Sequence, residues 1–524
     1  MGCIQNFRPR WGVLSLFFLT VLVYSPALGA GYLGYDDHWL IRDNTLLGEA
    51  SAETLRAIFL DLRFDTRIAL GAEYLPVRDL FTLLLRGVLE LSPEAMHLVH
   101  LLLYLSAVFV VRAVLIALVG PGLLAELSAI LFAIHPVHAE SVVWLAGSKD
   151  LLALNFTAAA VHSYLRGARL GILSTFALLA LFSKSTSVIL PGLFLLADLA
   201  LRRKIRRAEL LLTTLITGAA LAMHLHVGDI VGMIAPPLAE NAADVFASAS
   251  VIFSRYLGLS FFIHPHSIVY DVGRYGPFDP AAVGAVLLFA GLGVLAVFAA
   301  RREGRIHLFA LALFFLALGP VSQVLAPLQN RMADRYLLLA VLGPMLSLSA
   351  VYLSILERIS RLKLPMVSLL IAVIGFLGWE RASTYASTEA LFLEASIRAP
   401  GSPLGPYQLG THYESLERYQ EAELAYREAF LRSEKGTSDR RKAGNNWARM
   451  LFARGAIQEA RAVYETLYQE GPPSGRILYN LAKVRARDGD HEGSKAALEE
   501  LRRRFPTYER DRERLPGSGP LADR

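Results

Sequence analysis

The sequence predicts an all-α protein in two parts: a polytopic membrane helix bundle of about eleven spans over residues 1–380, and a tetratricopeptide-repeat α-solenoid over residues 381–510. The chain has 524 residues, of which 54% are hydrophobic and only 19% are charged, whereas about a quarter of residues are charged in soluble proteins. The charges also gather at one end, because residues 381–524 hold 45 of the 98 charged residues. A cytosolic enzyme, a fibrous protein and a single-pass receptor are therefore excluded.

The net charge and the cysteine content limit the partners and the kinds of site that this protein can have. A net charge of +6 is typical of the basic residues that flank membrane spans on the cytoplasmic side. The sequence has no long Lys/Arg run and no alternation of aromatic and basic residues, so we expect no nucleic-acid partner. Cys3 is the one cysteine, which excludes an intrachain disulfide and a thiolate metal cluster.

Eleven stretches are apolar enough, and close enough to 20 residues, to be predicted as spans. The first covers 12–30 and follows Arg8 and Arg10. It ends in Ala-Leu-Gly-Ala, which resembles a signal-peptidase site, but we expect an uncleaved span because many others follow. The other ten stretches are 94–118, 122–136, 150–167, 170–184, 186–201, 208–228, 280–300, 306–326, 336–356 and 363–380.

The placement of arginines predicts the orientation of these spans. Arg8 and Arg10 place the N-terminus in the cytoplasm, and the basic run 202–207 returns to that side after six spans. A further apolar stretch, 245–263, would put the arginines of 301–305 outside if it crossed the membrane. We therefore predict a re-entrant or interfacial helix at 245–263, and we expect the C-terminal part on the outer side.

The first of four polar clusters on the predicted outer face lies in the long loop 31–93. Two adjacent carboxylates, Asp36 and Asp37, precede His38. Such a pair is repulsive unless a cation or a shared proton relieves it, which suits one acid to deprotonate a hydroxyl group while the other orients it. A solvated acidic loop is the alternative interpretation. Further along, a helix on the membrane surface is predicted by the apolar spacing of Leu55, Ile58, Phe59 and Leu62.

The second cluster runs from His135 to Asp150. His135, His138 and Glu140 could ligate a metal ion, but Pro136 between the histidines argues against a regular helix. We expect instead a polar turn that lines a lipid-phosphate site, with Lys149 as its cation and Asp150 as the partner of Lys149.

The third and fourth polar clusters each contain basic residues. Lys184 lies between two apolar runs, so its ammonium group must reach the membrane interface or meet an anion. In the loop 329–336, Arg331 and Arg335 bracket Asp334, and two arginines in this arrangement could clamp a phosphate group. A salt bridge that stabilises the topology is the alternative for this loop.

The C-terminal part has the period of about 34 residues that is typical of tetratricopeptide repeats. Such arrays bind extended peptides, so we expect a protein partner. Residues 511–524 are predicted to be a charged, disordered tail. The three repeats are indicated by Leu409, Gly410, Tyr413, Ala422, Tyr426 and Ala429, then by Trp447, Ala448, Leu451, Ala460, Tyr464 and Pro472, and last by Leu481, Ala482, Leu498 and Pro506.

Together these stretches resemble the TMTC family of transmembrane and tetratricopeptide-repeat O-mannosyltransferases and its bacterial relatives. The resemblance is carried by 35–47, by 135–142 with 147–152, by 332–336 and by the repeats. It implies a GT-C fold in the bacterial inner membrane, a polyprenyl-phosphate sugar as donor, often of mannose, and transfer to a hydroxyl group outside the cytoplasm. The loop 31–93 resembles the catalytic loop of the family.

Two departures from the family pattern concern the contacts to the donor. The family has an arginine between the tyrosine and the proline that match Tyr74 and Pro76, whereas this chain has Leu75, with Arg78 nearby. Family members often carry a glutamate where this chain has Ser185, directly after Lys184.

The expected reaction is an inverting sugar transfer. Asp36 or Asp37 takes the proton of the acceptor hydroxyl group, while Lys149, Lys184, Arg331 and Arg335 stabilise the leaving phosphate. No metal or other cofactor is required by this scheme, although a divalent metal is not excluded. The acceptor is a protein Ser/Thr that the repeats bind, and the alternatives are a lipid or cell-wall glycan acceptor, or a non-catalytic scaffold. Supporting roles are expected for His38, Arg78, His135, His138, Glu140, Asp150 and Asp334.

Overall fold

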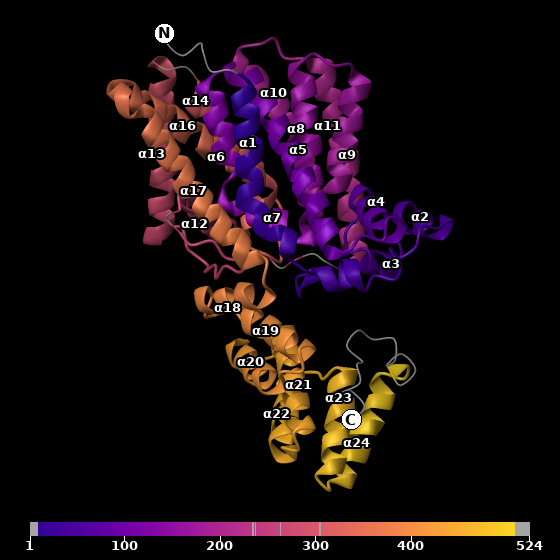
Figure 1. Cartoon of the computed structure of the whole chain (residues 1–524). Helices are drawn as coiled ribbons and strands as arrows, with labels where there is room; N and C mark the ends of the chain where they lie inside the picture. The colour runs from indigo at the N-terminus through magenta and orange to yellow at the C-terminus, as the bar shows by residue number, and fades with distance from the viewer. Residues whose placement is uncertain (1–8, 233–234, 236, 263, 303–304, 509–524) are drawn as a thin grey trace. The chain divides into compact units, whose positions relative to one another are not determined.

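The computed structural model describes residues 9–508, apart from 233–234, 236, 263 and 303–304, and this part of the chain is helical without any strand (Figure 1). The chain divides into two compact units, residues 1–387 and 388–524. The last helix of the first unit, α17 (Lys363–Tyr385), runs through the predicted boundary at residue 380. The predicted disordered tail, 511–524, lies outside the described residues.

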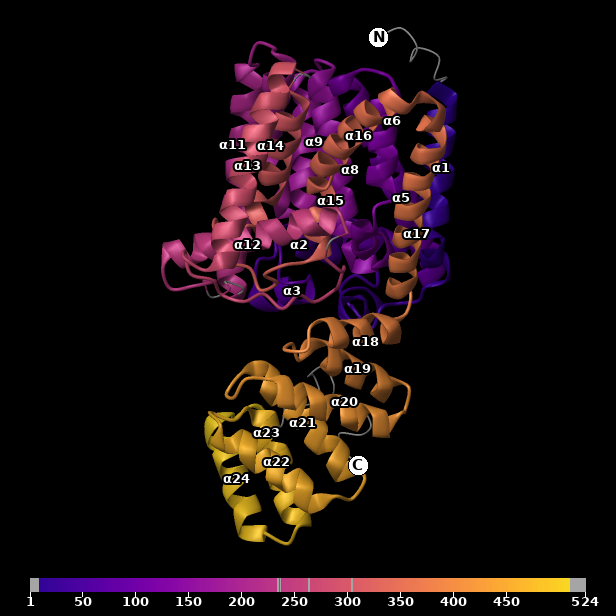
Figure 2. The same cartoon turned by 90° about the vertical axis from the view of Figure 1, so that its left-hand side faces the viewer.

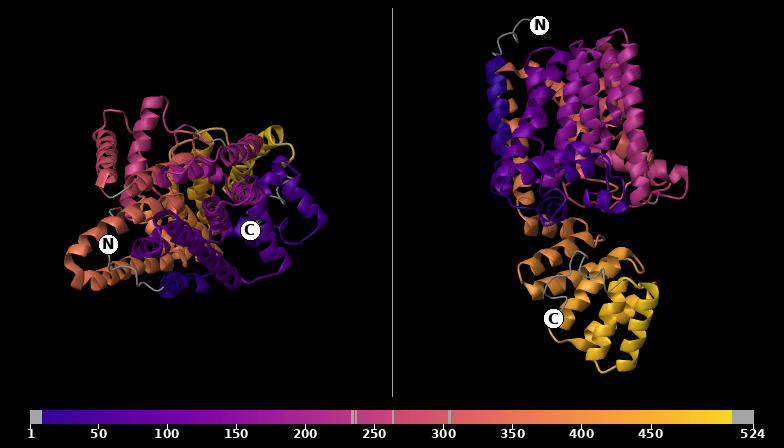
Figure 3. Two further views of the ribbon diagram at one scale, coloured as in Figure 1. Left: turned by 90° about the horizontal axis from the view of Figure 1, so that it is seen from above. Right: turned by 90° about the vertical axis from the view of Figure 1, so that its right-hand side faces the viewer.

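Most helices of the first unit lie alongside one another as a bundle (Figure 1; Figure 3, right). α1 packs against α5, α6 and α17, α8 lies between α5 and α9, and α14 packs against α16. The bundle consists of α1 (Pro9–Tyr24), α5 (Pro93–Val119), α6 (Leu123–Ala133), α7 (Ala139–Val143), α8 (Ser148–Leu165), α9 (Leu170–Ser183), α10 (Leu190–Leu201), α11 (Arg207–Val231), α13 (Pro280–Arg302), α14 (Ile306–Leu318), α15 (Leu337–Ala340), α16 (Leu342–Leu356) and α17.

Several of these helices are long and apolar enough to cross a membrane. Six described helical segments meet that condition, and a seventh is formed if Leu123–Ala133 and Pro136–Val143, which meet at 46°, count as one broken span. Shorter apolar helices lie at Leu170–Ser183, Ser185–Leu201 and Ile306–Val321. A polytopic membrane bundle is thus supported, while the predicted number of eleven spans remains a prediction. The six segments are Gly12–Gly29, Pro93–Val119, Arg207–Val231, Pro280–Arg301, Leu342–Ile359 and Lys363–Tyr385.

Two of the apolar stretches predicted as spans, 122–136 and 170–184, end at interruptions of the helix. Lys184 has an extended backbone (φ −160°, ψ 136°) between α9 and η6 (Ser185–Ile189), so the helix stops there. Pro136 begins a short 3₁₀ turn, η4 (Pro136–His138), after α6, because proline lacks the N–H that a continuing helix needs. These interruptions bring polar side chains to the ends of short helices.

One helix lies across the bundle. α12 (Ala242–Ser260) covers most of the stretch 245–263, for which we predicted a re-entrant or interfacial helix, and it runs crosswise in the view of Figure 2. Ala247 and Val251 of α12 are buried where they pack on Ala282 of α13.

The first loop folds into a small helical cap on the bundle. It contains η2 (His38–Arg42), α2 (Ala52–Phe59), α3 (Phe64–Ala69), α4 (Pro76–Thr82) and η3 (Leu83–Val88). The backbone N–H of Thr54 donates to the Ser51 hydroxyl at 3.0 Å and so caps α2. Of the residues predicted to face the membrane surface, Leu55 and Phe59 are exposed, but Ile58 is buried, because it packs with Leu70 inside the cap.

The described residues of the second unit, 388–508, form one helix, α18 (Thr388–Arg398), and three helical pairs. Small residues lie where the helices of a pair meet: Gly410 faces the ring of Tyr426, and Ala448 and Ala460 are buried in the core of the array. Larger side chains such as Tyr464 fill the remaining space. The pairs are α19 (Leu404–Ser415) with α20 (Tyr419–Arg432), α21 (Ser438–Ala453) with α22 (Ile457–Gln469), and α23 (Gly475–Arg487) with α24 (His491–Arg504).

A glycine in the bundle leads to a testable prediction. A Cβ atom on Gly343 of α16 would collide with the backbone carbonyl of Ala310 in α14, so Gly343→Ala must push two packed helices apart. We expect the substitution to lower the free energy of unfolding by about 1–3 kcal/mol and the melting temperature in detergent by several degrees. Gly284→Ala in α13, where nothing lies within 4 Å, is the matched control, and equal melting of both variants would contradict this packing.

Candidate active site

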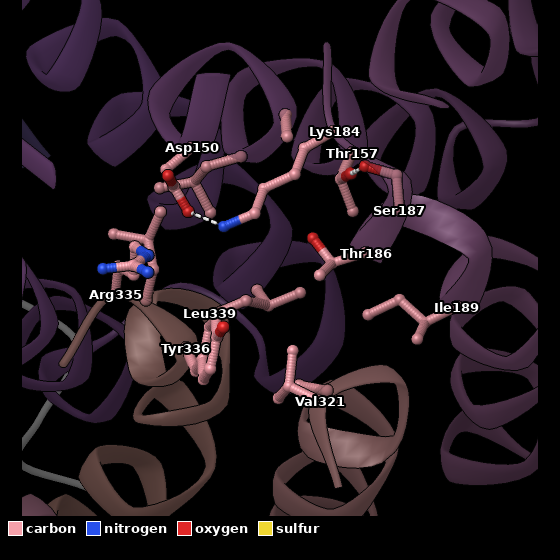
Figure 4. A pocket seen from close by; sticks show the side chains of 14 residues that line it. Asp150, Thr157, Lys184, Thr186, Ser187, Ile189, Val321, Arg335, Tyr336 and Leu339 are labelled. Carbon is pink, nitrogen blue, oxygen red and sulfur yellow. Dashed lines mark hydrogen bonds and ion pairs between the residues drawn. The ribbon is translucent and has the colours of Figure 1, made fainter. Parts of the chain in front are cut away.

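A pocket of about 50 Å³ lies among four segments of the first unit (Figure 4). α8, η6, η7 (Gly319–Val321) and the segment 335–339 line it. Charged side chains gather at one end, where Lys184 reaches toward Asp150 and Arg335 lies close by, whereas Ile189 and Val321 lie away from that end. The remaining lining is apolar except for the hydroxyl groups of Thr157, Thr186, Ser187 and Tyr336. The pocket is therefore amphipathic along its length.

The cations of this region are held by carboxylates from other segments. The ammonium group of Lys184 forms an ion pair with Asp150, and that of Lys149 lies 2.5 Å from the Glu73 carboxylate. This pairing differs from the prediction that Asp150 is the partner of Lys149. The two residues are consecutive at the start of α8 and so point in directions about 100° apart.

Arg335 is fixed from two directions. Its guanidinium group forms an ion pair with Glu140, and its backbone N–H donates to the same carboxylate at 2.8 Å. The guanidinium carbon lies 5.6 Å from the ring centre of Trp144 and 5.3 Å from that of Tyr336. A cation held in this way keeps one geometry, which suits it to meet a fixed anion.

The adjacent aspartates have different surroundings. Asp37 is fully buried, and its carboxylate accepts hydrogen bonds from the backbone N–H groups of Leu33 at 3.0 Å and Ala146 at 2.8 Å. Asp36 is half-buried and accepts a hydrogen bond from the Trp39 indole at 3.1 Å. Asp37 therefore joins the first loop to the turn before α8, and Asp36 is the carboxylate of the pair that solvent reaches.

Burial raises the pKa of both aspartates. For Asp37 burial outweighs the hydrogen bonds from Leu33 and Ala146, and the charge of Asp36 adds to the shift, so the pKa rises to about 7. Burial also raises the pKa of Asp36, although the hydrogen bond from Trp39 and the charges of Lys149 and Arg335 oppose it. A carboxylate with a raised pKa is a better base than an ordinary aspartate.

Glu73 is a further carboxylate of the region, and it was not predicted from the sequence. Burial opposes its ionisation, but the charges of Lys149 and Arg78 and the hydrogen bond from Lys149 outweigh burial and lower the pKa of Glu73 to about 2. The Arg78 guanidinium lies 3.4 Å from Glu73 and 2.6 Å from Asp79. Glu73 belongs to no recognisable motif. The one hint in the sequence is that it lies two residues before Leu75, where the chain departs from the family pattern.

The two histidines of the second cluster connect helices. A ring nitrogen of His135 lies 3.2 Å from the Ser260 carbonyl, and the other accepts from the backbone N–H of Val137 at 3.2 Å. The ring of His138 pairs with the Tyr104 hydroxyl and, at 3.1 Å, with the Leu338 carbonyl. The described residues contain no group of three or more His, Cys, Asp or Glu side chains able to hold a metal ion.

Of the predicted site residues, Lys184, Asp150 and Arg335 line the pocket, and the others do not. Arg331 donates to the backbone carbonyl of Val272 at 3.0 Å. Asp334 accepts from the Tyr270 hydroxyl and lies 3.4 Å from His266. Residues 334–336 form a 3₁₀ turn, η8 (Asp334–Tyr336). Of the two arginines predicted to clamp a phosphate group, only Arg335 lines the pocket, so the predicted clamp is not seen. His38 begins η2 and is half-buried.

The pKa of Asp37 predicts how stability depends on pH. A folded-state pKa of about 7 against an ordinary value of 3.8 means that the folded protein holds a proton that the unfolded chain releases between these values. The free energy of unfolding should therefore fall as the pH rises from about 4 to about 7, by up to about 4 kcal/mol, and then level off. Thermal melts of the detergent-solubilised protein between pH 5 and pH 8 measure this dependence.

Asp37→Asn, which has no titrating proton, should flatten that part of the profile. Glu53→Gln is the control, because Glu53 is exposed on α2 in the same loop. A slope that is the same in the wild type and in Asp37→Asn would contradict the assignment.

Comparison with known proteins finds one matching family. The tetratricopeptide-repeat family model matches residues 451–511, which include α22, α23 and α24. No curated protein and no solved structure matches the chain. The second unit therefore contains a tetratricopeptide repeat, a type of module that generally mediates contacts between proteins.

Proposed function

We propose that this chain is a membrane glycosyltransferase of GT-C type, which transfers a sugar from a polyprenyl-phosphate donor to a hydroxyl group on the outer side of the membrane. One observation carries the proposal. Asp36, a carboxylate with a raised pKa, is within electrostatic reach of Arg335, which lines a pocket that is charged at one end and apolar along the rest. The resemblance to the TMTC family favours mannose as the sugar and a protein Ser/Thr as the acceptor.

The pocket suits the end of a lipid-linked donor. Lys184 and Arg335 are the cations at its charged end, and they would meet the phosphate group. Apolar side chains such as Leu154, Val321 and Leu339 line the remainder and suit the first isoprene units of the lipid. Lys149 belongs to the same charged region through its pair with Glu73. Arg331 has no part in this proposal, because it faces Val272.

The proposed reaction needs one base and one stabilised leaving group. Asp36 takes the proton of the acceptor hydroxyl group as its oxygen forms a bond to the anomeric carbon of the sugar. The bond between that carbon and the phosphate oxygen breaks, and the polyprenyl phosphate leaves with the electron pair. Arg335 and Lys184 stabilise the negative charge that develops on the phosphate. Asp37 holds the loop of Asp36 in place through its backbone hydrogen bonds.

The proposed setting is the one predicted from the arginines. About eleven spans with a cytoplasmic N-terminus would place the loop 31–93 and the repeats on the outer side of a bacterial inner membrane. The repeats would then present an acceptor protein to the site, which favours a protein acceptor over a lipid or cell-wall glycan.

Replacing the proposed base should remove activity. We expect Asp36→Asn to lower the rate of sugar transfer by about 10³-fold, because a positioned base contributes 10² to 10⁴-fold. The measurement is transfer from a polyprenyl-phosphate sugar to acceptor protein in proteoliposomes. Asp65→Asn, at an exposed position of α3, is the control. Full activity of Asp36→Asn would reject the catalytic role of Asp36, whereas the absence of transfer by the wild type would favour a non-catalytic scaffold that presents the repeats.

The charge of Glu73 should tune the base. The charge of Lys149 lowers the pKa of Asp36, and the charge of Glu73 raises it. Glu73→Gln therefore removes the charge that raises this pKa, and it also releases Lys149 from its ion pair. Both changes lower the pKa of Asp36, and the acidic limb of the pH–rate profile should move to lower pH, with a fall of about tenfold in the maximal rate as the base weakens. Glu53→Gln should leave the profile unchanged. An acidic limb that stays in place in Glu73→Gln would refute this coupling.

A further inference from the structure

The first helices of the second and third repeats are strongly basic. α21 carries four cations and one acid, and α23 carries four cations and no acid. The second helices show no such excess, because α22 has one cation and two acids, and α24 has four cations and three acids. The positive charge of these two repeats therefore gathers on their first helices, α21 and α23.

The two basic helices repeat one pattern at the same positions. Lys442, Asn446 and Arg449 are spaced at i, i+4 and i+7 on α21, and Arg476, Asn480 and Lys483 follow 34 residues later on α23. Residues at this spacing share one face of a helix. Each of the two repeats thus presents a cation, an amide and a second cation in one row. We call the surface formed by these six side chains the basic face.

Contacts between the repeats show that the two rows adjoin. The Asn480 amide donates to the Asn445 side chain at 2.9 Å, and Asn445 donates to Asn446 at 3.2 Å. The Tyr407 hydroxyl of α19 interacts with Asn446 of α21 and with the charge of Arg476 of α23. The first helices of all three repeats therefore meet along the basic face.

Other cations of the same helices point elsewhere. Arg440 lies 2.6 Å from Glu470, and Arg485 lies 2.7 Å from Glu465. Glu465 belongs to the second helix α22, and Glu470 directly follows that helix. The basic face already accepts one carboxylate of the chain itself, because Glu414 of α19 lies 2.6 Å from Arg449. Lys442 is exposed, and Lys483 is half-buried with its ammonium group 5.8 Å from the ring centre of Phe452.

We infer that the basic face binds an acidic segment of a partner protein in an extended conformation. The cations suit carboxylates, and the amides of Asn446 and Asn480 suit the peptide backbone, because an amide group offers both a donor and an acceptor. Packed helices lie about 8–10 Å apart, and an extended polyproline-type chain covers about 9 Å in three residues. The partner segment should therefore carry a carboxylate at every third position. This inference does not depend on the transferase activity.

The test uses the full chain in nanodiscs of neutral lipid and a fluorescein-labelled peptide of five Glu-Gly-Ser units. We expect saturable binding by fluorescence anisotropy that weakens as salt is raised. The matching Gln-Gly-Ser peptide should bind at least tenfold more weakly. A Glu-Sar-Ser peptide, whose sarcosine lacks the backbone N–H, should also lose affinity, because a contact to the backbone amide is removed.

The variant Lys442→Gln/Lys483→Gln should weaken binding of the Glu-Gly-Ser peptide about tenfold. Arg427→Gln/Lys495→Gln removes two exposed cations from the second helices α20 and α24 and should leave the affinity unchanged. The melting temperature of each variant reports whether the array still folds, and the peptide series on the wild type tests the inference without any substitution.

Three results would overturn the inference. The first is equal binding of the glutamate and glutamine peptides, and the second is equal loss of affinity in the two double variants. The third is that Lys442→Gln/Lys483→Gln loses binding to vesicles of anionic lipid while its affinity for the peptide is unchanged, which would identify the basic face as a membrane contact instead.

Discussion

The first unit depends on ion pairs between side chains that water reaches poorly. Lys184 with Asp150, Lys149 with Glu73 and Arg335 with Glu140 each join segments that are distant in the sequence. For the two buried pairs, Lys184 with Asp150 and Arg335 with Glu140, removing one member leaves a charge that neither water nor protein neutralises, which costs about 3–5 kcal/mol. The same pairs therefore hold the first loop, α7, α8 and the segment after α14 in one arrangement, and they shape the charged end of the pocket.

The repeats could be predicted from the sequence because their contacts are local. A small residue such as Gly410 faces a large one such as Tyr426 within one helical pair, so spacing along the chain carries the information. The membrane unit was less predictable. Its composition indicates apolar helices, and Pro136 marks one break locally, but no proline marks the interruption at Lys184, and hydropathy alone does not reveal it.

The candidate site was predicted by residue type better than by partner. Lys184, Asp150 and Arg335 do line one pocket, as expected for polar residues on one face of the bundle. Which carboxylate meets which cation is decided by directions that differ by about 100° between neighbours on a helix. The sequence therefore could not predict that Glu73 pairs with Lys149 or that Arg331 contacts Val272. The difference between Asp36 and Asp37 likewise depends on the backbone N–H of Ala146, more than 100 positions away.

The pairing of every cation around the pocket has a consequence for the energetics of the proposed reaction. A phosphodiester that becomes a phosphate monoester gains one negative charge, and the carboxylate of Asp36 loses one when it takes the proton. The total charge enclosed by the site is then the same before and after transfer, so the fixed pairs need not rearrange. A step that leaves the total charge of the site unchanged would need no compensating ion to enter or leave the site.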